Sequence, residues 1–216
     1  MIIAGIDEAG RGPCVGPMVL AVACIEKKNE EKLQEIGVKD SKMLSPKQRD
    51  KLFTQIHAIA SEVGYVEVSA KEIDSLRDWK SLNEVEAMRI GLLLNSLKVK
   101  PEIVFVDSPD VLAGNFAERI KKYISFKTII RSEHKADQNY PVVSAASIVA
   151  KVQRDLAIVE LEKIYGKIGS GYPHDESTIK FLKNFLQQNN QLPEIVRKSW
   201  LTTQRIMNEK FQQKII

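Results

Sequence analysis

The stretch IIAGIDEAGRGPCVG, residues Ile2–Gly16, decides the fold that we expect for this chain. It opens with a mostly apolar, branched run, a pattern that favours a short buried strand. The strand leads directly into two carboxylates, Asp7 and Glu8. Because neighbouring strand residues point to opposite faces, the two acids can share a site only if the strand ends or kinks here, which Gly5 and Gly10 would permit. The stretch predicts either a metal-and-phosphate site or a turn with solvated acids.

A turn of small residues follows the two acids. Gly10 and Gly12 flank Arg11, and Pro13 closes the turn. Glycine allows the backbone to approach a ligand closely, so this turn favours contacts through backbone N–H groups.

Two further acids stand near the ends of predicted elements. Residues 103–106, IVFV, favour a central strand, and Asp107 follows it. Since ligands of open α/β sheets bind beyond the carboxyl ends of the strands, Asp107 is expected at the same site, with capping of a helix over 111–124 as the alternative. Asp137 precedes a long helix predicted over 142–165 and is either a cap-region acid or a fourth member of the cluster.

The other periodicities complete a mixed α/β chain with a helical C-terminal part. Further strands are predicted over 18–25, antiparallel to the first, and over 65–68 and 126–131. Further helices are predicted over 27–37, 46–59, 87–97, 175–188, 193–200 and 202–214. The turn-rich segment GSGYPH, residues 169–174, predicts a boundary between a domain over 1–168 and an extension over 169–216.

Composition indicates an ordinary globular protein with a locally basic tail. The 216 residues are 44% hydrophobic and 28% charged, with a formal net charge of +4. Residues 1–166 carry 24 basic and 24 acidic side chains, whereas residues 167–216 carry 8 and 4. The tail therefore holds the whole excess, which fits either a surface that docks a polyanion or an ordinary C-terminal helix.

The two cysteines, Cys14 and Cys24, lie in one apolar segment without metal-ligand spacing. They are expected to be buried thiols rather than a disulfide, and a cytoplasmic location follows from that and from the absence of a basic-then-apolar leader. The longest stretch without charge, Gly12–Ile25, is too short to span a bilayer.

The candidate site residues are all oxygen ligands: Asp7, Glu8, Asp107 and Asp137. Such a set suits Mg²⁺ or Mn²⁺, whereas zinc prefers cysteine and histidine. Two such ions can activate water and stabilise the leaving oxygen of a phosphodiester. A P-loop, a GxSxG turn and paired Cys/His spacing are absent from the sequence.

Six motifs in order give the chain a resemblance to ribonuclease H type 2 (ribonuclease HII), in its archaeal style. They are GIDEAGRGPCVGPMV at Gly5–Val19, DSK at Asp40–Lys42, VDSPD at Val106–Asp110, EHKAD at Glu133–Asp137, ASIVAKVQRD at Ala146–Asp155 and GSGYPHD at Gly169–Asp175. The resemblance implies an RNase H-like mixed sheet flanked by helices, with a small helical C-terminal extension. It also implies an endonuclease that hydrolyses the RNA strand of RNA–DNA hybrids and cuts at ribonucleotides embedded in duplex DNA, leaving 3′-hydroxyl and 5′-phosphate ends.

The same resemblance implies roles for individual residues. The four acids correspond to the catalytic, metal-binding residues of that family. The turn of Gly10, Arg11 and Gly12 matches a loop whose backbone contacts the ribonucleotide 2′-OH, the atom that distinguishes RNA from DNA. An added Cβ at Gly10 or Gly12 is therefore expected to damage substrate choice more than folding. Tyr172 matches a tyrosine that packs against the sugar at the RNA–DNA junction, and Lys42 matches a lysine near substrate phosphate.

Two other classes of protein remain as alternatives at this point. One is a different nuclease of related architecture, such as a junction resolvase or an integrase-like enzyme. The other is a module that binds hybrids without cutting them. We expect a monomer whose last residues, QQKII, are a candidate contact for a sliding clamp.

Overall fold

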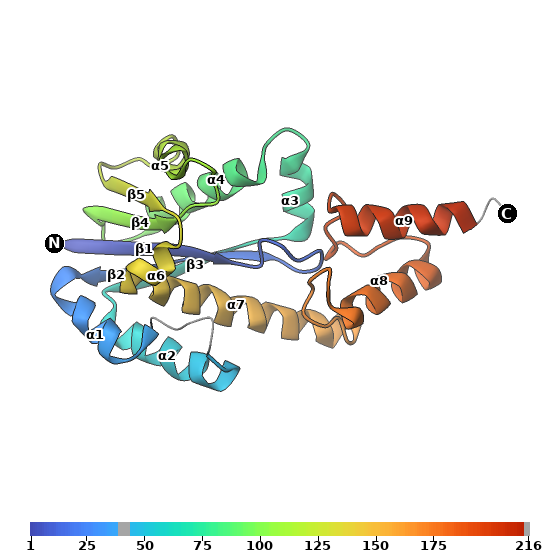
Figure 1. Cartoon of the computed structure of the whole chain (residues 1–216), viewed down its shortest axis with the longest axis horizontal. Helices are drawn as coiled ribbons and strands as arrows, with labels where there is room; N and C mark the ends of the chain where they lie inside the picture. The colour runs from blue at the N-terminus through green and yellow to red at the C-terminus, as the bar shows by residue number, and fades with distance from the viewer. Residues whose placement is uncertain (39–43, 214–216) are drawn as a thin grey trace. The chain divides into compact units, whose positions relative to one another are not determined.

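The computed structural model describes residues 1–38 and 44–213, and its five strands form one sheet in the order β3-β2-β1-β4-β5 (Figure 1). The strands are β1 (Ile2–Ala9), β2 (Met18–Glu26), β3 (Glu62–Val68), β4 (Ile103–Asp107) and β5 (Ile129–Glu133). The helices are η1 (Lys27–Asn29), α1 (Glu30–Glu35), α2 (Pro46–Ile59), α3 (Ala70–Arg77), α4 (Leu82–Ser96), α5 (Ala113–Lys121), α6 (Ala136–Asn139), α7 (Pro141–Tyr165), α8 (Glu176–Asn189) and α9 (Leu201–Gln213). The predicted mixed α/β class is confirmed.

Strand β1 lies in the middle of the sheet, between an antiparallel and a parallel neighbour. It pairs antiparallel with β2, as predicted, and parallel with β4, where Ile6 lies opposite Val106. Strand β4 in turn pairs parallel with β5, and Asp107 lies opposite Glu133. Since β1, β4 and β5 run in the same direction, their carboxyl ends meet at one edge of the sheet.

Strand β1 runs through its two acids and ends one residue after them, at Ala9. Its pairing with β2 continues to the pair Ala9–Val19, because β2 is long enough to offer a partner to every residue. Gly5 serves packing and not a kink. A Cβ at this position would overlap the main chain of Val142 and Val143 at the start of α7. Glycine here therefore allows α7 to pack closely against β1.

Contacts divide the chain into two compact units that alternate along the sequence. Unit 1 comprises Met1–Ala9, Val19–Glu67 and Ser81–Gln153, and unit 2 comprises Gly10–Met18, Val68–Lys80 and Arg154–Ile216. In unit 1, α1, α2 and the first part of α7 cover one face of the sheet, and α4 and α5 lie on the other side (Figure 1). The predicted boundary between residues 168 and 169 falls within unit 2.

Each unit has a hydrophobic core of its own. In unit 1, α2 contributes Leu52 and Ile56, which pack with Val142 and Val149 of α7 against the sheet. In unit 2, the core is built from the turn 14–15 and from α8, α9 and the segments before them, and its buried residues are Cys14, Val15, Ile168, Phe181, Leu182, Leu186, Leu192, Val196 and Ile206. Residues 14 and 15 thus fold with the C-terminal part and not with the strand that precedes them.

The predicted helix over 193–200 is also wrong. The described chain forms turns here, and the next helix, α9, begins only at Leu201. Long-range backbone bonds replace helical ones, because Arg197 donates its N–H to the Cys14 carbonyl oxygen (2.9 Å) and Gly16 donates to the Ile195 carbonyl oxygen (2.8 Å). Helix α3 is an element that the sequence patterns did not predict.

Both cysteines are buried free thiols, as predicted. Burial raises the pKa of Cys14 to about 11 and that of Cys24 to about 12. In the part of the chain that the structure describes, no helix has the length and apolar character needed to cross a bilayer.

Candidate active site

The two acids of the opening motif lie near the end of β1 in unit 1. Asp7 is only 8% exposed, Glu8 is half-buried, and the Glu8 N–H donates to Asp7 Oδ1 at 2.8 Å. The pKa of Asp7 is raised well above its usual value, first by burial, then by the negative charge of Glu8 and, more weakly, by that of Asp107. Asp7 is therefore close enough to Glu8 and to Asp107 for its charge to be repelled by theirs.

Asp107 is the last residue of β4 and does not cap the helix that follows. The N-cap of α5 is Leu112, which has no side-chain cap, so the capping alternative is wrong. Asp107 Oδ1 instead accepts a hydrogen bond from the N–H of Ala136, the first residue of α6, at 2.9 Å. The carboxylate of β4 is thereby fixed against the segment that carries Asp137.

Asp137 lies in the short helix α6 and is 5% exposed. The chain enters α6 through Lys135, which is in the left-handed conformation with φ 56°. The carbonyl oxygen of Asp137 accepts from the hydroxyl of Ser144, so its main chain is held to α7. Asp137 thus lies ahead of the long helix, as predicted, but within a separate short helix whose first residue, Ala136, bonds to Asp107.

The four acids do not already form a complete set of metal ligands in the described structure. Among the described residues, no group of three or more His, Cys, Asp or Glu side chains is arranged to hold a metal ion. The charge of Asp7 interacts with those of Glu8 and Asp107, and Asp107 connects to Asp137 through the backbone of Ala136. The donor chemistry nevertheless fits a hard divalent cation, since all four groups offer only oxygen and a cation would relieve the repulsion that raises the pKa of Asp7.

Two residues of α7 extend this cluster, and sequence reasoning missed their role. The Ser147 hydroxyl hydrogen-bonds to Asp7, which opposes the rise in the pKa of that carboxyl. Lys151 Nζ in turn donates to Ser147 Oγ at 2.9 Å. The signal was present in the motif ASIVAKVQRD, where a serine and a lysine four residues apart fall on one face of a helix.

In unit 2, the glycine turn lies beside Tyr172. A Cβ on Gly12 would meet Cε1 of Tyr172 at 3.7 Å, an ordinary contact distance. Gly10 has a φ of 81°, and a Cβ there would lie 2.5 Å from Cδ of Arg154 and 2.7 Å from the carbonyl oxygen of Pro17. An added Cβ at Gly10 would therefore damage folding itself, contrary to the expectation that it damages substrate choice more than folding, because both the backbone conformation and the space exclude it.

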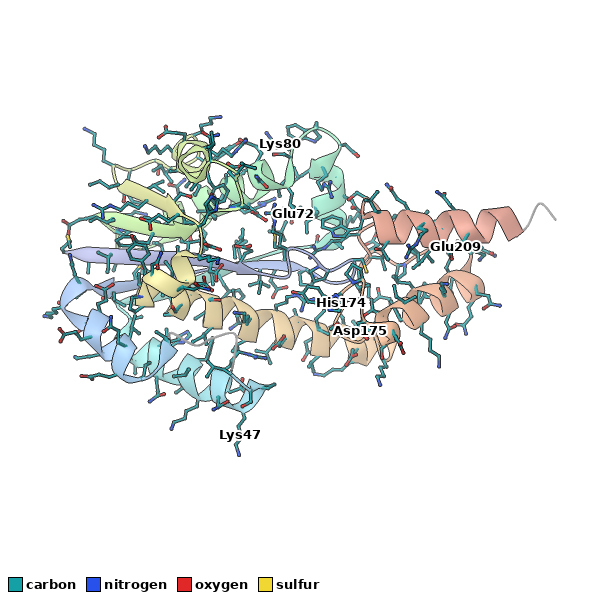
Figure 2. All side chains as sticks on the ribbon, viewed as in Figure 1. Lys47, Glu72, Lys80, His174, Asp175 and Glu209 are labelled. Atoms are coloured by element: carbon teal, nitrogen blue, oxygen red, sulfur yellow. The ribbon has the colours of Figure 1, made fainter. Side chains whose placement is uncertain are left out.

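Arg154 is a buried residue that contacts Tyr172 and Ser170 near that turn. It is buried, its guanidinium lies over the ring of Tyr172 (5.3 Å to the centroid), and Nη2 donates to the Ser170 carbonyl oxygen at 2.9 Å. Burial lowers its pKa. The tyrosine ring also lies 5.4 Å from the ring of His174, which Figure 2 labels next to Asp175 ahead of α8.

Two predicted features lie outside the described residues: Lys42, with the rest of its DSK motif, and the last three residues of the C-terminal QQKII. Much of the predicted basic tail is engaged elsewhere. Arg197 is fully buried, and Lys183 pairs with Glu209 at 3.4 Å. Sequence reasoning counted both as part of a surface charge.

Comparisons with known proteins agree with the motifs. The sequence model of the ribonuclease HII family matches residues 4–203. The crystal structure of ribonuclease H2 from Pyrococcus horikoshii OT3 matches with a TM-score of 0.92 and 46% identity, over 99% of this chain and 100% of that chain. The structure of the PCNA:RNase HII complex from Archaeoglobus fulgidus matches with a TM-score of 0.84 and 37% identity, over 93% and 95%.

A more distant neighbour shows the fold alone. Bst-RNase HIII, solved in complex with Mn²⁺, has a TM-score of 0.81 at 17% identity, over 98% of this chain and 71% of that chain. Together these matches confirm the RNase H-like α/β fold that the motifs predicted.

Proposed function

Since this chain belongs to the ribonuclease HII family and is a nuclease that acts on RNA in RNA–DNA hybrids, we propose that it also cuts duplex DNA at single embedded ribonucleotides. We further propose that Asp7, Glu8, Asp107 and Asp137 are its catalytic acids. The products would carry a 3′-hydroxyl and a 5′-phosphate. This function rests on one observation above all, the parallel pairing of β1 with β4, which brings Asp7 and Asp107 to adjoining strand ends.

The four acids would hold two divalent ions, Mg²⁺ or Mn²⁺. When bound, such ions supply Lewis acidity that activates water and stabilises the leaving oxygen of a phosphodiester. The chain itself supplies the preorganisation. Ser147 and the backbone of Ala136 hold Asp7 and Asp107 in place, while α7 fixes the main chain of Asp137. Lys151, hydrogen-bonded to Ser147, places a positive charge next to this cluster.

Substrate choice would come from the glycine turn and from Tyr172. Gly12 and Tyr172 lie side by side in unit 2, so a sugar that packs on the tyrosine ring would also meet the backbone of the turn. Backbone N–H groups can donate to a 2′-OH, which DNA lacks at that position. Lys42 would contact a nearby phosphate.

Further assignments belong to the same proposal. The PCNA:RNase HII complex of a relative supports a sliding-clamp contact through the C-terminus of this chain. Buried, reduced thiols fit a cytoplasmic location. We propose that the protein works as a monomer.

The decisive experiment is cleavage of a DNA duplex that carries one ribonucleotide, with Mg²⁺, with Mn²⁺ and with chelator, followed by mapping of the cut and its end groups. We expect a single metal-dependent cut. A DNA-only branched junction is the control substrate, because a junction resolvase would cut it and this protein should not. Metal-independent cleavage, or cutting of the junction but not of the ribonucleotide duplex, would contradict the proposal.

Asp107→Asn is the matched variant for this assay. The asparagine keeps an oxygen that can accept from the Ala136 N–H, so the fold should be retained. It loses the negative charge, and we expect cleavage to fall by about 10²–10³-fold at the same metal concentration. If the variant cuts as fast as the parent, Asp107 is not a catalytic acid.

A further inference from the structure

The guanidinium of Arg197 is fully buried and donates hydrogen bonds to main-chain oxygens of the glycine turn, residues 10–16. Nη2 donates to the carbonyl oxygens of Gly10 (2.6 Å) and Gly16 (3.0 Å). Nη1 donates to that of Arg11 at 2.9 Å, and Nε donates to that of Gly16 at 3.1 Å. One side chain from the C-terminal part of the sequence thus fixes three peptide groups of the turn.

Trp200 completes this arrangement. Its indole Nε1 donates to the carbonyl oxygen of Gly12 at 3.1 Å. The guanidinium of Arg197 lies over the same indole, 4.8 Å from the ring centroid, and that of Arg77 lies at the same distance. The carbonyls of Gly10, Arg11 and Gly12 are therefore all held by Arg197 or Trp200.

Burying the charged guanidinium of Arg197 costs free energy of desolvation. Burial lowers the pKa of Arg197 to about 9, and the nearby positive charge of Arg154 adds to the effect. An apolar side chain of similar volume would fill the space without that desolvation cost. What the guanidinium adds is a rigid fork of donors, which can fix several carbonyls at once.

The direction of these carbonyls determines where the N–H groups point. No peptide bond in the described chain is cis, so each N–H points opposite to the carbonyl of the same peptide group. The carbonyls of Gly10 and Arg11 share their peptide groups with the N–H groups of Arg11 and Gly12. Those two N–H groups are consequently directed away from Arg197. The carbonyls of Gly12 and Gly16 precede prolines, which carry no N–H.

We propose that Arg197 is a positioning residue that sets the preference for a ribonucleotide, by orienting the N–H groups of Arg11 and Gly12 toward the sugar hydroxyl. Trp200 is its supporting positioning residue, because its ring lies against the guanidinium and its indole N–H holds the Gly12 carbonyl next to those two groups. This inference rests on the proposed reading of the 2′-OH by the glycine turn. It assigns the selectivity of that turn to two side chains more than 180 residues away in the sequence.

The test is a ratio of affinities measured in chelator, so that no cleavage occurs. The dissociation constant is measured for an all-DNA duplex and for the same duplex with one ribonucleotide, and their quotient is the selectivity. Arg197→Lys keeps the charge but replaces the fork by one ammonium, and we expect the selectivity to fall about tenfold. Trp200→Phe keeps the packing of the ring and loses only the indole N–H, so a smaller fall of about threefold is expected.

Leu186→Ala is the control for loss of stability. This side chain packs in the core of unit 2, and its truncation should lower the melting temperature while the selectivity stays at the parent value. Should Arg197→Lys fail to fold, Trp200→Phe decides. A selectivity equal to the parent's in the folded variants would overturn the inference. A parent that binds both duplexes equally would instead refute the reading of the 2′-OH by the turn itself.

Discussion

Gly12→Ala separates ribonucleotide recognition from folding. The φ of Gly12 lies outside the left-handed region, and the new Cβ would make an ordinary contact with Tyr172 at 3.7 Å. The methyl group restricts the unfolded chain, which stabilises by about 0.4–1 kcal/mol, so the melting temperature should stay level or rise. In the complex, the same methyl group would hold the backbone off the sugar. Because a displacement of about 1 Å can cost about 10²-fold, cleavage at a single ribonucleotide should fall by that factor.

Gly10→Ala is the contrasting variant. Alanine at a φ of 81° costs about 1–2 kcal/mol, and the overlap with Pro17 and Arg154 adds about 1–3 kcal/mol. For a chain of this size, the sum of about 2–5 kcal/mol lowers the melting temperature by roughly 4–20 °C. This variant should lose stability and activity together, whereas Gly12→Ala should lose activity alone.

The assay is single-turnover cleavage of the one-ribonucleotide duplex, run beside thermal unfolding of each variant. Gly114→Ala serves as the matched control, since a Cβ there would meet nothing within 4 Å and α5 would gain helix propensity. It should cut like the parent. If Gly12→Ala also cuts at the parent rate, the backbone at residue 12 does not approach the substrate and the proposed reading of the sugar is wrong.

Two further predictions concern the C-terminal part. Lys180 and Lys167 line a surface pocket of about 430 Å³, whereas Lys183 is paired with Glu209. Lys180→Ala should therefore reduce the slope of hybrid affinity against salt concentration by about one charge, and Lys183→Ala should reduce it by less. Equal slopes for both variants and the parent would exclude this helix as a docking surface. Hydrogen bonds from Ser170 and Ser177 lower the pKa of Asp175 to about 2, so its carboxylate stabilises the folded state fully above pH 4 and progressively less down to pH 2. Asp175→Asn should therefore lower the free energy of unfolding by about 1 kcal/mol at pH 7, after allowance for the exposure of this side chain. The difference in melting temperature between the parent and this variant should shrink below pH 4. A difference that stays constant with pH would contradict this account.

The sequence predicted the positions of the acids well, because they follow from local patterns. A run such as IVFV must be buried, and the residue that ends it must lie at the edge of the sheet, so Asp107 was placed correctly at the end of β4. Parallel pairing then brings it next to β1, as the rule for strand carboxyl ends anticipates. The local conformations of Asp107 and Asp137 were not predictable in this way, since their partners, Ala136 and Ser144, are set by packing of α6 and α7.

Long-range contacts account for the main errors. Residues 193–200 have a proline, apolar residues and a tryptophan at spacings that favour a short helix, yet they form turns. Their backbone groups bond instead to residues 14 and 16, far away in the sequence, and Arg197 turns its side chain into the same turn. No local pattern encodes such partners, so propensity was overridden by tertiary hydrogen bonds.

The glycines of the opening motif show why residue type alone does not reveal a role. Gly5 avoids overlap with α7, Gly10 adopts a left-handed conformation, and Gly12 does neither in the free protein. The first two are required by the fold itself. A missing side chain at residue 12 has no such structural reason, although the carbonyl of this residue is held by Trp200. The absence of a Cβ at that position is therefore better explained by close approach of a substrate than by folding, which is the argument for placing the ribonucleotide sugar at Gly12.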